Sequence, residues 1–389
     1  LRYAIICPMG KLYFSHSLEC LAAHLMVELS ANSDGFFNPG TILVPSSWMK
    51  QWLHLKLSDA SPSSGVAGFE ILSLQEGIKK LSPGSAGFTE IFCSVFSELS
   101  LIDDEAVVNY CKKHPNGQTE LAYRLALLFL RYGEHGSSAL FDLDHWEQKL
   151  LKKLFLEGRL RFSWQVLQGS KASGSKKIHC FGFDFLTKAE LHYFSEGCFY
   201  FFSPCAEYWI DALSVQEQGK LIRCWRKKGA SLEKQKELGQ YLAEAPPLLA
   251  NLGKLGRENY KNLDDFDWEI IEDYPEEGAL AQSNLAEVRQ NLLSFSQSNT
   301  KKTPDPSLVL LEGGASCFQE LKQVYQAIFD LVENKGILPS DIALFSPDIK
   351  KYAPLIETLF ASIPYRIFGI ESRRKSPFYQ GFIRLSEFC

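Results

Sequence analysis

The sequence has little of three features that would point to a particular class of protein. Its formal net charge is −5, so the chain as a whole is not a polybasic nucleic-acid binder, and any such site must be a local patch. No hydrophobic run approaches the length of a membrane span, and Leu1–Cys7 is far too short for one. The ten cysteines include no CxxC pair, which predicts free thiols in a reducing compartment. These absences indicate a cytoplasmic protein with no membrane partner.

Common catalytic motifs are also missing. The sequence contains no GxSxG, HExxH or GxGxxG pattern and no paired carboxylates in a convincing context. His16 and His24 lie two helical turns apart, but no third metal ligand is within reach along the sequence, so both are expected to be ordinary core or surface histidines. The composition, with 46% hydrophobic and 22% charged residues, is that of a globular protein long enough for two or three domains.

The most informative stretch is Thr41–Leu57, which reads TILVPSSWMKQWLHLKL. Its apolar start has the length of a buried parallel strand, and the proline and two serines that follow predict a turn and a helix start, since either serine could cap the helix. Open parallel sheets bind ligands beyond the carboxyl ends of their strands. This unit is therefore either part of a binding edge or an ordinary piece of scaffold.

Strand and helix signals alternate on both sides of a stretch that has only helical periodicity. In the first part of the chain, strands are expected at 12–14, 42–44, 69–72, 178–183 and 199–202. Because helical segments separate these strands, the pattern predicts an α/β fold with a parallel sheet.

This order predicts four segments. They are a first part of a helicase-like (RecA-like) α/β domain at 1–73, an all-helical insertion at 74–168, the second part of that domain with helical additions at 169–300, and the start of a second α/β domain at 307–389. The last segment is expected to hold strands at 308–311, 342–345 and 365–368 beside helices at 318–334 and 352–360. Apolar periodicity at 378–388 runs to the end of the sequence, from which we expect further domains beyond it.

Two such domains, the first split by a helical insertion, suggest a nucleic-acid motor. The two nucleotide-binding motifs of such a motor are, however, missing. A motor needs a GxxxxGK[ST] phosphate loop and an acid at a strand end that holds magnesium. Here the first strand–helix turn, Phe14–Leu18, contains neither glycine nor lysine, and Phe181 stands where the acid is expected. Asp184 is close but lies beyond the apolar run, so a turn or cap role is favoured. The sequence therefore predicts no nucleotide or other cofactor site in this chain.

Several stretches, in order along the chain, resemble the RecC family, the gamma subunits of exodeoxyribonuclease V. They are ILVPSSWMKQWLHLKL followed by GVAGFEILSL, FFSPCAEYWID at 201–211, LLANLGKLGRENY at 248–260, ILPSDIALFSPDIKKYAPLIETLF at 337–360, and ESRRKSPFYQGFIRL after it. GKLGR and SDIALFSPDI together are quite specific, and the matches extend from about Tyr13 to the end. In the LLANLGKLGRENY stretch, Leu252 replaces a tryptophan of the family.

The resemblance implies helicase-like domains that have lost their ATPase motifs, in agreement with the absences above. It also implies assembly with RecB-like and RecD-like subunits and contact with DNA, both duplex ends and single strands, during double-strand break repair and recombination. Family members guide the separated strands, and characterised ones monitor the 3′-ended strand for a Chi sequence. The resemblance places polar readers of that strand at Ser47 and Gln51 and a basic residue at Arg159.

The chain departs from characterised members at Pro45, Lys80, Leu127 and Leu130. The resemblance therefore supports the scaffold more strongly than recognition of the same Chi sequence.

Each candidate DNA-binding residue has an ordinary structural alternative. Ser47 and Gln51 could be a helix cap and an exposed helix side chain, and Arg159 could form a surface salt bridge. Arg373 and Arg374, with the lysine after them, form the densest basic cluster of the chain, which could contact phosphate or lie in a solvated loop.

The two tryptophans near the start of this helix, Trp48 and Trp52, are not expected to share one role. Core packing is expected for both by default, and one of them could instead stack on a base.

Three functions remain open at this point. A non-catalytic, DNA-guiding subunit is favoured, and the alternatives are an active superfamily 1 helicase-type ATPase and a pure protein-interaction scaffold.

Overall fold

A computed structural model gives the fold of the chain. It describes residues 10–31, 40–60, 69–81, 84–114, 116–136, 138–142, 145–168, 178–229, 231–234, 236–237, 245–276, 283–296, 305–309 and 313–368. The chain divides into two compact units, residues 1–303 and residues 304–389. Within the described residues, no helix is long and apolar enough to cross a membrane.

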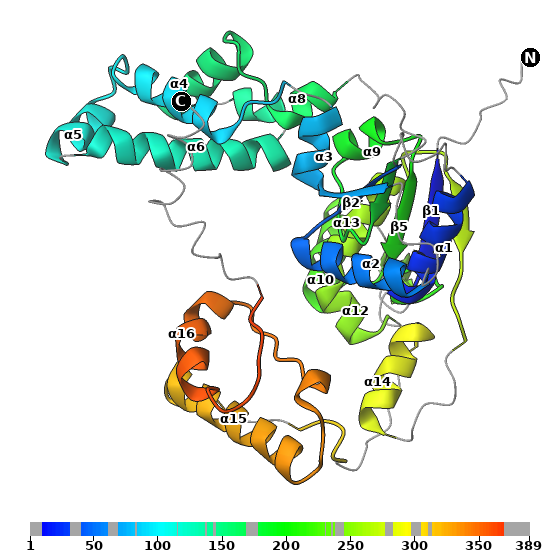
Figure 1. Cartoon of the computed structure of the whole chain (residues 1–389). Helices are drawn as coiled ribbons and strands as arrows, with labels where there is room; N and C mark the ends of the chain where they lie inside the picture. The colour runs from blue at the N-terminus through cyan, green and yellow to red at the C-terminus, as the bar shows by residue number, and fades with distance from the viewer. Residues whose placement is uncertain are drawn as a thin grey trace, which may run out of the picture. The chain divides into compact units, whose positions relative to one another are not determined.

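The first unit is built on a six-stranded parallel sheet (Figure 1). Its strands are β1 (Lys11–Ser15), β2 (Gly40–Val44), β3 (Phe69–Ser73), β4 (Ile178–Phe181), β5 (Cys198–Phe202) and β6 (Glu269–Glu272). They lie in the order β3-β2-β4-β5-β1-β6, and every neighbouring pair is parallel. This confirms the predicted α/β fold with a parallel sheet. After the long helical stretch that follows β3, the chain returns to the same sheet, where β4 pairs with β2.

Successive side chains of each strand point to opposite faces of the sheet, and helices cover both faces. On one face, Tyr13 and Ile42 pack with helices α1 (Leu18–Ala31) and α2 (Ser47–Ala60). On the other face, Leu12 and Leu43 pack with α3 (Leu74–Leu81), α9 (Lys188–Tyr193) and α13 (Lys254–Leu263). Covered faces explain why these strands read as almost continuous apolar runs in the sequence.

Strand β6 is absent from the sequence prediction. Its sequence, Glu-Ile-Ile-Glu, is four residues long and mostly exposed. It pairs only with β1, at the edge of the sheet. An edge strand needs little apolar side chain to be stable, so its local signal is weak.

Between β3 and β4 the described residues form helices only. After α3 come α4 (Phe88–Leu99), α5 (Glu105–Lys113), α6 (Gly117–His135), the 3-10 turn η1 (Ser138–Phe141), α7 (Trp146–Leu151), the π-helical turn η2 (Lys152–Leu156) and α8 (Ser163–Leu167). From α4 onward they share a separate core, in which the rings of Phe155 and Phe162 stack with centroids 3.7 Å apart. The predicted domain boundaries at 73/74 and 168/169 stay a prediction.

After β5 the chain adds α10 (Val215–Lys227), α12 (Pro247–Leu252), α13 and α14 (Asn284–Leu293). Helices α12 and α13 follow one another directly, with a break at Gly253. Three residues later Gly256 lies against the buried Trp209, whose ring carbon would be 2.4 Å from an added Cβ. In GKLGR, Gly253 thus lies at the break between the two helices, and Gly256 allows the close contact with Trp209.

The second unit contains α15 (Cys317–Glu333), the 3-10 turn η4 (Pro339–Asp341) and α16 (Ile349–Leu359), packed through Leu321, Ile356 and Phe360. The two helices were predicted.

The strands predicted in this unit at 342–345 and 365–368 are wrong, because both segments are irregular. In the strand predicted at 308–311, Leu308 and Val309 are irregular too, and the last two residues lie outside the described residues. A strand exists only when its backbone pairs with a neighbour, and no described segment of this unit pairs with these. The side chain of Phe345 is accordingly 90% exposed. The described residues therefore do not show the predicted start of a second α/β domain.

Candidate nucleic-acid interface

The carboxyl ends of the parallel strands lie at one edge of the sheet. The register pairs Ser15 with Phe202 and Val44 with Ser73, so the turns that follow these strands emerge at the same edge. In open α/β sheets this edge is the usual ligand-binding edge. The sequence analysis tied several residues to a phosphate loop, a magnesium acid or a reader of the DNA strand. Apart from Arg159 and the arginines at 373–374, they lie at one of these strand ends or shortly after it in the sequence.

The β1–α1 turn uses its own side chains where a motor would hold phosphate. Ser17 donates its backbone N–H to Ser15 Oγ (3.1 Å), and Ser17 Oγ accepts the backbone N–H of Cys20 (3.3 Å). Ser15 is fully buried. One of the helix's first amides, the kind of donor that cradles phosphate in a motor, is thus satisfied within the turn.

The position of the missing acid is filled by an aromatic cluster. Phe181, at the end of β4, is fully buried, and its ring centroid lies 6.1 Å from that of Trp52 and 5.8 Å from that of Tyr200. Gly182 follows with φ +71°, close to the side chain of Met49. Asp184 is exposed beyond this turn. An ionised carboxylate at position 181 would be buried among apolar groups at a high energetic cost.

Helix α2 begins at this edge and presents polar side chains to solvent. Ser46 Oγ accepts the backbone N–H of Met49 (3.2 Å), so Ser46 is the cap and Ser47 is the first helical residue. Ser47 and Gln51 are both exposed, and their spacing of four residues puts them on one side of the helix. The edge thus brings these two predicted readers together.

The two tryptophans of α2 have different environments. Trp52 packs into the sheet core against Phe181, whereas the side chain of Trp48 is 49% exposed. Core packing, the default expectation, therefore holds for Trp52 and not for Trp48. Trp48 neighbours Ser47 in the sequence, so an aromatic surface accompanies the polar residues at the start of α2.

The described basic candidate, Arg159, does not belong to α2. Arg159 is exposed in the turn after η2, within the helical block and not on α2. Its neighbour Arg161 donates to the backbone oxygens of Gly158 (3.0 Å) and Leu160 (2.9 Å), which fixes the turn. Arg373 and Arg374 lie outside the described residues. Arg159 is thus the candidate whose charge faces solvent, while Arg161 has a structural role.

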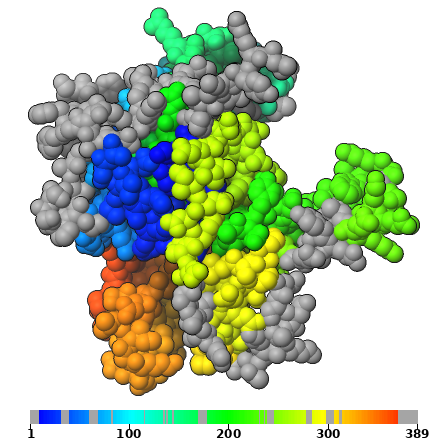
Figure 2. Space-filling model, turned by 90° about the vertical axis from the view of Figure 1, so that its right-hand side faces the viewer, coloured from blue at the N-terminus to red at the C-terminus, as the bar shows by residue number. Residues whose placement is uncertain are grey.

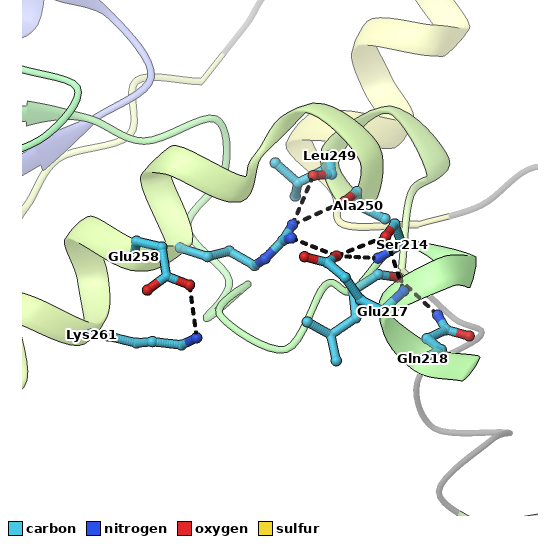
Figure 3. Close-up of polar contacts among 9 residues, drawn as sticks. Ser214, Glu217, Gln218, Leu249, Ala250, Glu258 and Lys261 are labelled. Atoms are coloured by element: carbon cyan, nitrogen blue, oxygen red, sulfur yellow. Dashed lines mark hydrogen bonds and ion pairs between the residues drawn. The ribbon is translucent and has the colours of Figure 1, made fainter. Parts of the chain in front are cut away.

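The arginine of GKLGR is also structural. Arg257 is 2% exposed, and its guanidinium donates to the backbone oxygens of Leu249 (3.4 Å) and Ala250 (3.0 Å) and to Glu217 (2.9 Å). Figure 3 shows these acceptors, on α12 and α10, converging on one point. Burial alone would raise the pKa of Glu217, but hydrogen bonds from Ser214 and the charge of Arg257 outweigh it and hold this pKa below its usual range.

One cluster at the same edge escaped the sequence analysis. Cys20 and His24 on α1 meet Asp273, which directly follows β6. The available signal was the four-residue spacing of Cys20 and His24, which puts both on one side of a helix. The third member comes from an edge strand with no clear local signal. His16, which the analysis paired with His24, instead stacks on Tyr274 with ring centroids 5.7 Å apart.

These features define a class: an α/β protein with a RecA-like parallel sheet and helical additions, without a phosphate loop after its first strand. Comparison with protein families then gives the family. The family model described as "RecC, N-terminal domain" matches residues 11–87 and 94–298, and the chain belongs to this family.

A relative in Escherichia coli (strain K12), "RecBCD enzyme subunit RecC", is 27% identical over 218 residues. The match covers 48% of this chain and 19% of that protein, so the chain spans about a fifth of its relative's length in this comparison.

Proposed function

We propose that this chain is a non-catalytic, DNA-binding part of a RecBCD-type complex, which guides and scans single-stranded DNA that enters from duplex ends. Its partners would be RecB-like and RecD-like subunits, and its place of action the cytoplasm. The observation that carries the proposal is which side chains occupy the carboxyl edge of the sheet. Side chains of the protein fill the positions where a motor binds nucleotide, while α2 exposes Ser47, Gln51 and Trp48 at the same edge.

The chemistry of these residues suits a strand that passes the edge. A glutamine amide can donate to and accept from a base edge, and an exposed tryptophan can stack on a base of any sequence. An exposed arginine holds phosphate without sequence preference. Gln51 is therefore proposed as a reader, and Arg159 as a contact that contributes affinity.

The test uses the complex assembled with RecB-like and RecD-like chains and measures single-strand binding at several salt concentrations. Arg159→Ala should weaken binding to all sequences and lower the slope of log K against log salt by roughly 0.7, the value for one lost phosphate contact on a single strand. Gln51→Ala should instead change the preference among sequences by about 1–3 kcal/mol if its contact is bidentate.

Matched controls are Arg124→Ala and Gln216→Ala. Arg124 is exposed in the same helical block and paired with Glu120, and Gln216 is exposed on α10 and not on α2. If Arg159→Ala and Gln51→Ala assemble normally and bind every strand as their controls do, the DNA path does not pass these residues.

A protein-interaction role is the second candidate, because α12 and α13 expose apolar side chains. Leu252 is 79% and Leu255 is 53% exposed. Partner contacts of this kind would leave single-strand binding by the complex insensitive to both edge substitutions, while Leu252→Asp would reduce co-purification with the partner chains.

A further inference from the structure

Three potential metal ligands meet where α1 passes the end of β6. Cys20 Sγ lies 3.1 Å from Asp273 Oδ2, and His24 Nε2 lies 2.8 Å from the same oxygen. The ligand atoms of all three residues lie within 4.8 Å of one another. Asp273 is 249 residues or more from its partners in the sequence, so only the fold brings the group together.

The backbone that carries these ligands is held by the sheet. Strand β6 pairs with β1 in a register that matches Phe14 with Glu272, and Asp273 donates its N–H to the oxygen of Phe14 (3.0 Å). Cys20 and His24 occupy successive turns of α1, which follows β1 directly. Figure 2 shows the yellow-green segment that contains β6 lying along the blue N-terminal segment at the surface.

The donor set points to a particular class of cation. A thiolate, an imidazole and a carboxylate together suit Zn²⁺ and similar transition metals, whereas Ca²⁺ and Mg²⁺ take oxygen ligands. A tetrahedral zinc site with bonds of about 2.0–2.3 Å separates its ligands by roughly 3.3–3.8 Å, so the observed spacing needs only small side-chain rotations. The side chains of His24 and Asp273 are 28% and 48% exposed, which leaves a route for an ion from solvent.

The geometry does not suit a cysteine nucleophile. The carboxylate lies between the thiol and the imidazole in the hydrogen-bond chain, so the imidazole does not activate the sulfur. Burial, with the Asp273 carboxylate as hydrogen-bond partner, raises the pKa of the Cys20 thiol, whereas a reactive cysteine needs a lowered one.

We propose that Cys20, His24 and Asp273 bind one Zn²⁺ ion, with water as the fourth ligand, and that this ion fastens the edge strand β6 to α1. On binding, the Cys20 thiol loses its proton to solvent and a zinc–sulfur bond replaces the hydrogen bond to Asp273. No electrons are transferred. The site lies beside the turn where a motor would bind phosphate.

The test titrates Co²⁺ and then Zn²⁺ into the full chain after removal of metals with a chelator. We expect one equivalent of Co²⁺ to produce a thiolate-to-cobalt charge-transfer absorption that Zn²⁺ abolishes, and saturating Zn²⁺ to raise the unfolding temperature. X-ray absorption of the zinc form should show one sulfur and three nitrogen or oxygen ligands. Cys20→Ser and Asp273→Asn should each lower the Co²⁺ affinity by at least about tenfold, and Cys20→Ser should remove the charge-transfer band.

Cys224→Ser is the matched control, because Cys224 is an exposed cysteine on α10, outside the cluster. It should bind both metals as the parent does. The proposal is overturned if the parent binds no stoichiometric metal, if Cys20→Ser keeps the parent's spectrum and affinity, or if the zinc form shows no sulfur ligand. The X-ray absorption result on the parent decides even if a variant fails to fold.

Discussion

At the scale of single residues, His179 shows how burial controls a titratable group. It lies in the middle of the sheet on β4, is 1% exposed, and its Nδ1 is 3.1 Å from the hydroxyl of Tyr200. Burial lowers the pKa of His179 to about 4, although the nearby carboxylate of Glu28 acts in the opposite direction. The imidazole is therefore neutral in the folded protein at physiological pH.

This environment predicts a pH dependence of stability. An unfolded histidine has a pKa of about 6.5, so between that pH and the folded pKa of about 4 the unfolded chain binds more protons than the folded one. The stabilising contribution is complete above about pH 6.5 and is lost as the pH falls through the folded pKa, with a total on the order of 3 kcal/mol.

The variant His179→Gln can still hydrogen-bond Tyr200 but cannot titrate, so its unfolding free energy should fall less steeply with decreasing pH. Urea unfolding at a series of pH values measures this slope. His54→Gln, at an exposed position of α2, is the control and should follow the parent. Parallel curves for parent and His179→Gln would contradict the assignment.

At the scale of elements, one buried arginine joins three helices. Arg257 on α13 satisfies two carbonyl groups of the last turn of α12 and pairs with Glu217 on α10. The helix ends would otherwise leave these carbonyl groups without partners. The specific motif GKLGR is thus explained by packing, without a ligand.

Arg257→Ala should destabilise the chain by about 2–4 kcal/mol, because it removes the buried partner of a half-buried ion pair and leaves two carbonyl groups unsatisfied. Chemical denaturation measures the loss. Lys261→Ala on the same helix removes an exposed ion pair with Glu258 and should change stability by no more than about 0.5 kcal/mol. Similar effects of the two substitutions would show that Arg257 is not the junction described here.

The elements that local sequence predicts well are those with a strong local signal. Strands β1 to β5 are apolar runs closed by turn residues, and α15 and α16 carry periodic apolar faces that meet each other. The failures have a common cause. Strand β6 exists because β1 offers its edge, whereas no described segment pairs with the apolar residues 342–345, which are irregular. Pairing with a distant segment cannot be deduced from the segment itself.

At the scale of the whole molecule, the carboxyl edge of the sheet is the place where a related motor would bind its nucleotide. The turn after β1 is closed by its own serine hydroxyls, and an aromatic cluster fills the end of β4. We therefore expect the chain neither to bind nor to hydrolyse ATP. Equilibrium binding of ATP with Mg²⁺, and hydrolysis with and without single-stranded DNA, measure this directly.

DNA-stimulated hydrolysis that Asp184→Asn abolishes would contradict this prediction, since Asp184 is the acid nearest to the strand end. Hydrolysis unaffected by that substitution would point to a contaminating motor.

The sequence by itself determined the α/β class, the parallel sheet, the absence of a phosphate loop and the RecC-like order of motifs, because all of these are written in local patterns and residue types. It also predicted the turn and the helix start that follow the second strand. Only the tertiary structure decided which serine caps α2, and that Trp52 packs against the core while Trp48 is exposed. It also decided that Arg161 and Arg257 bind backbone oxygens while Arg159 faces solvent. It alone brought Asp273 to Cys20 and His24. Contacts between residues so far apart in the sequence depend on strand order and helix packing. No local sequence pattern contains that information.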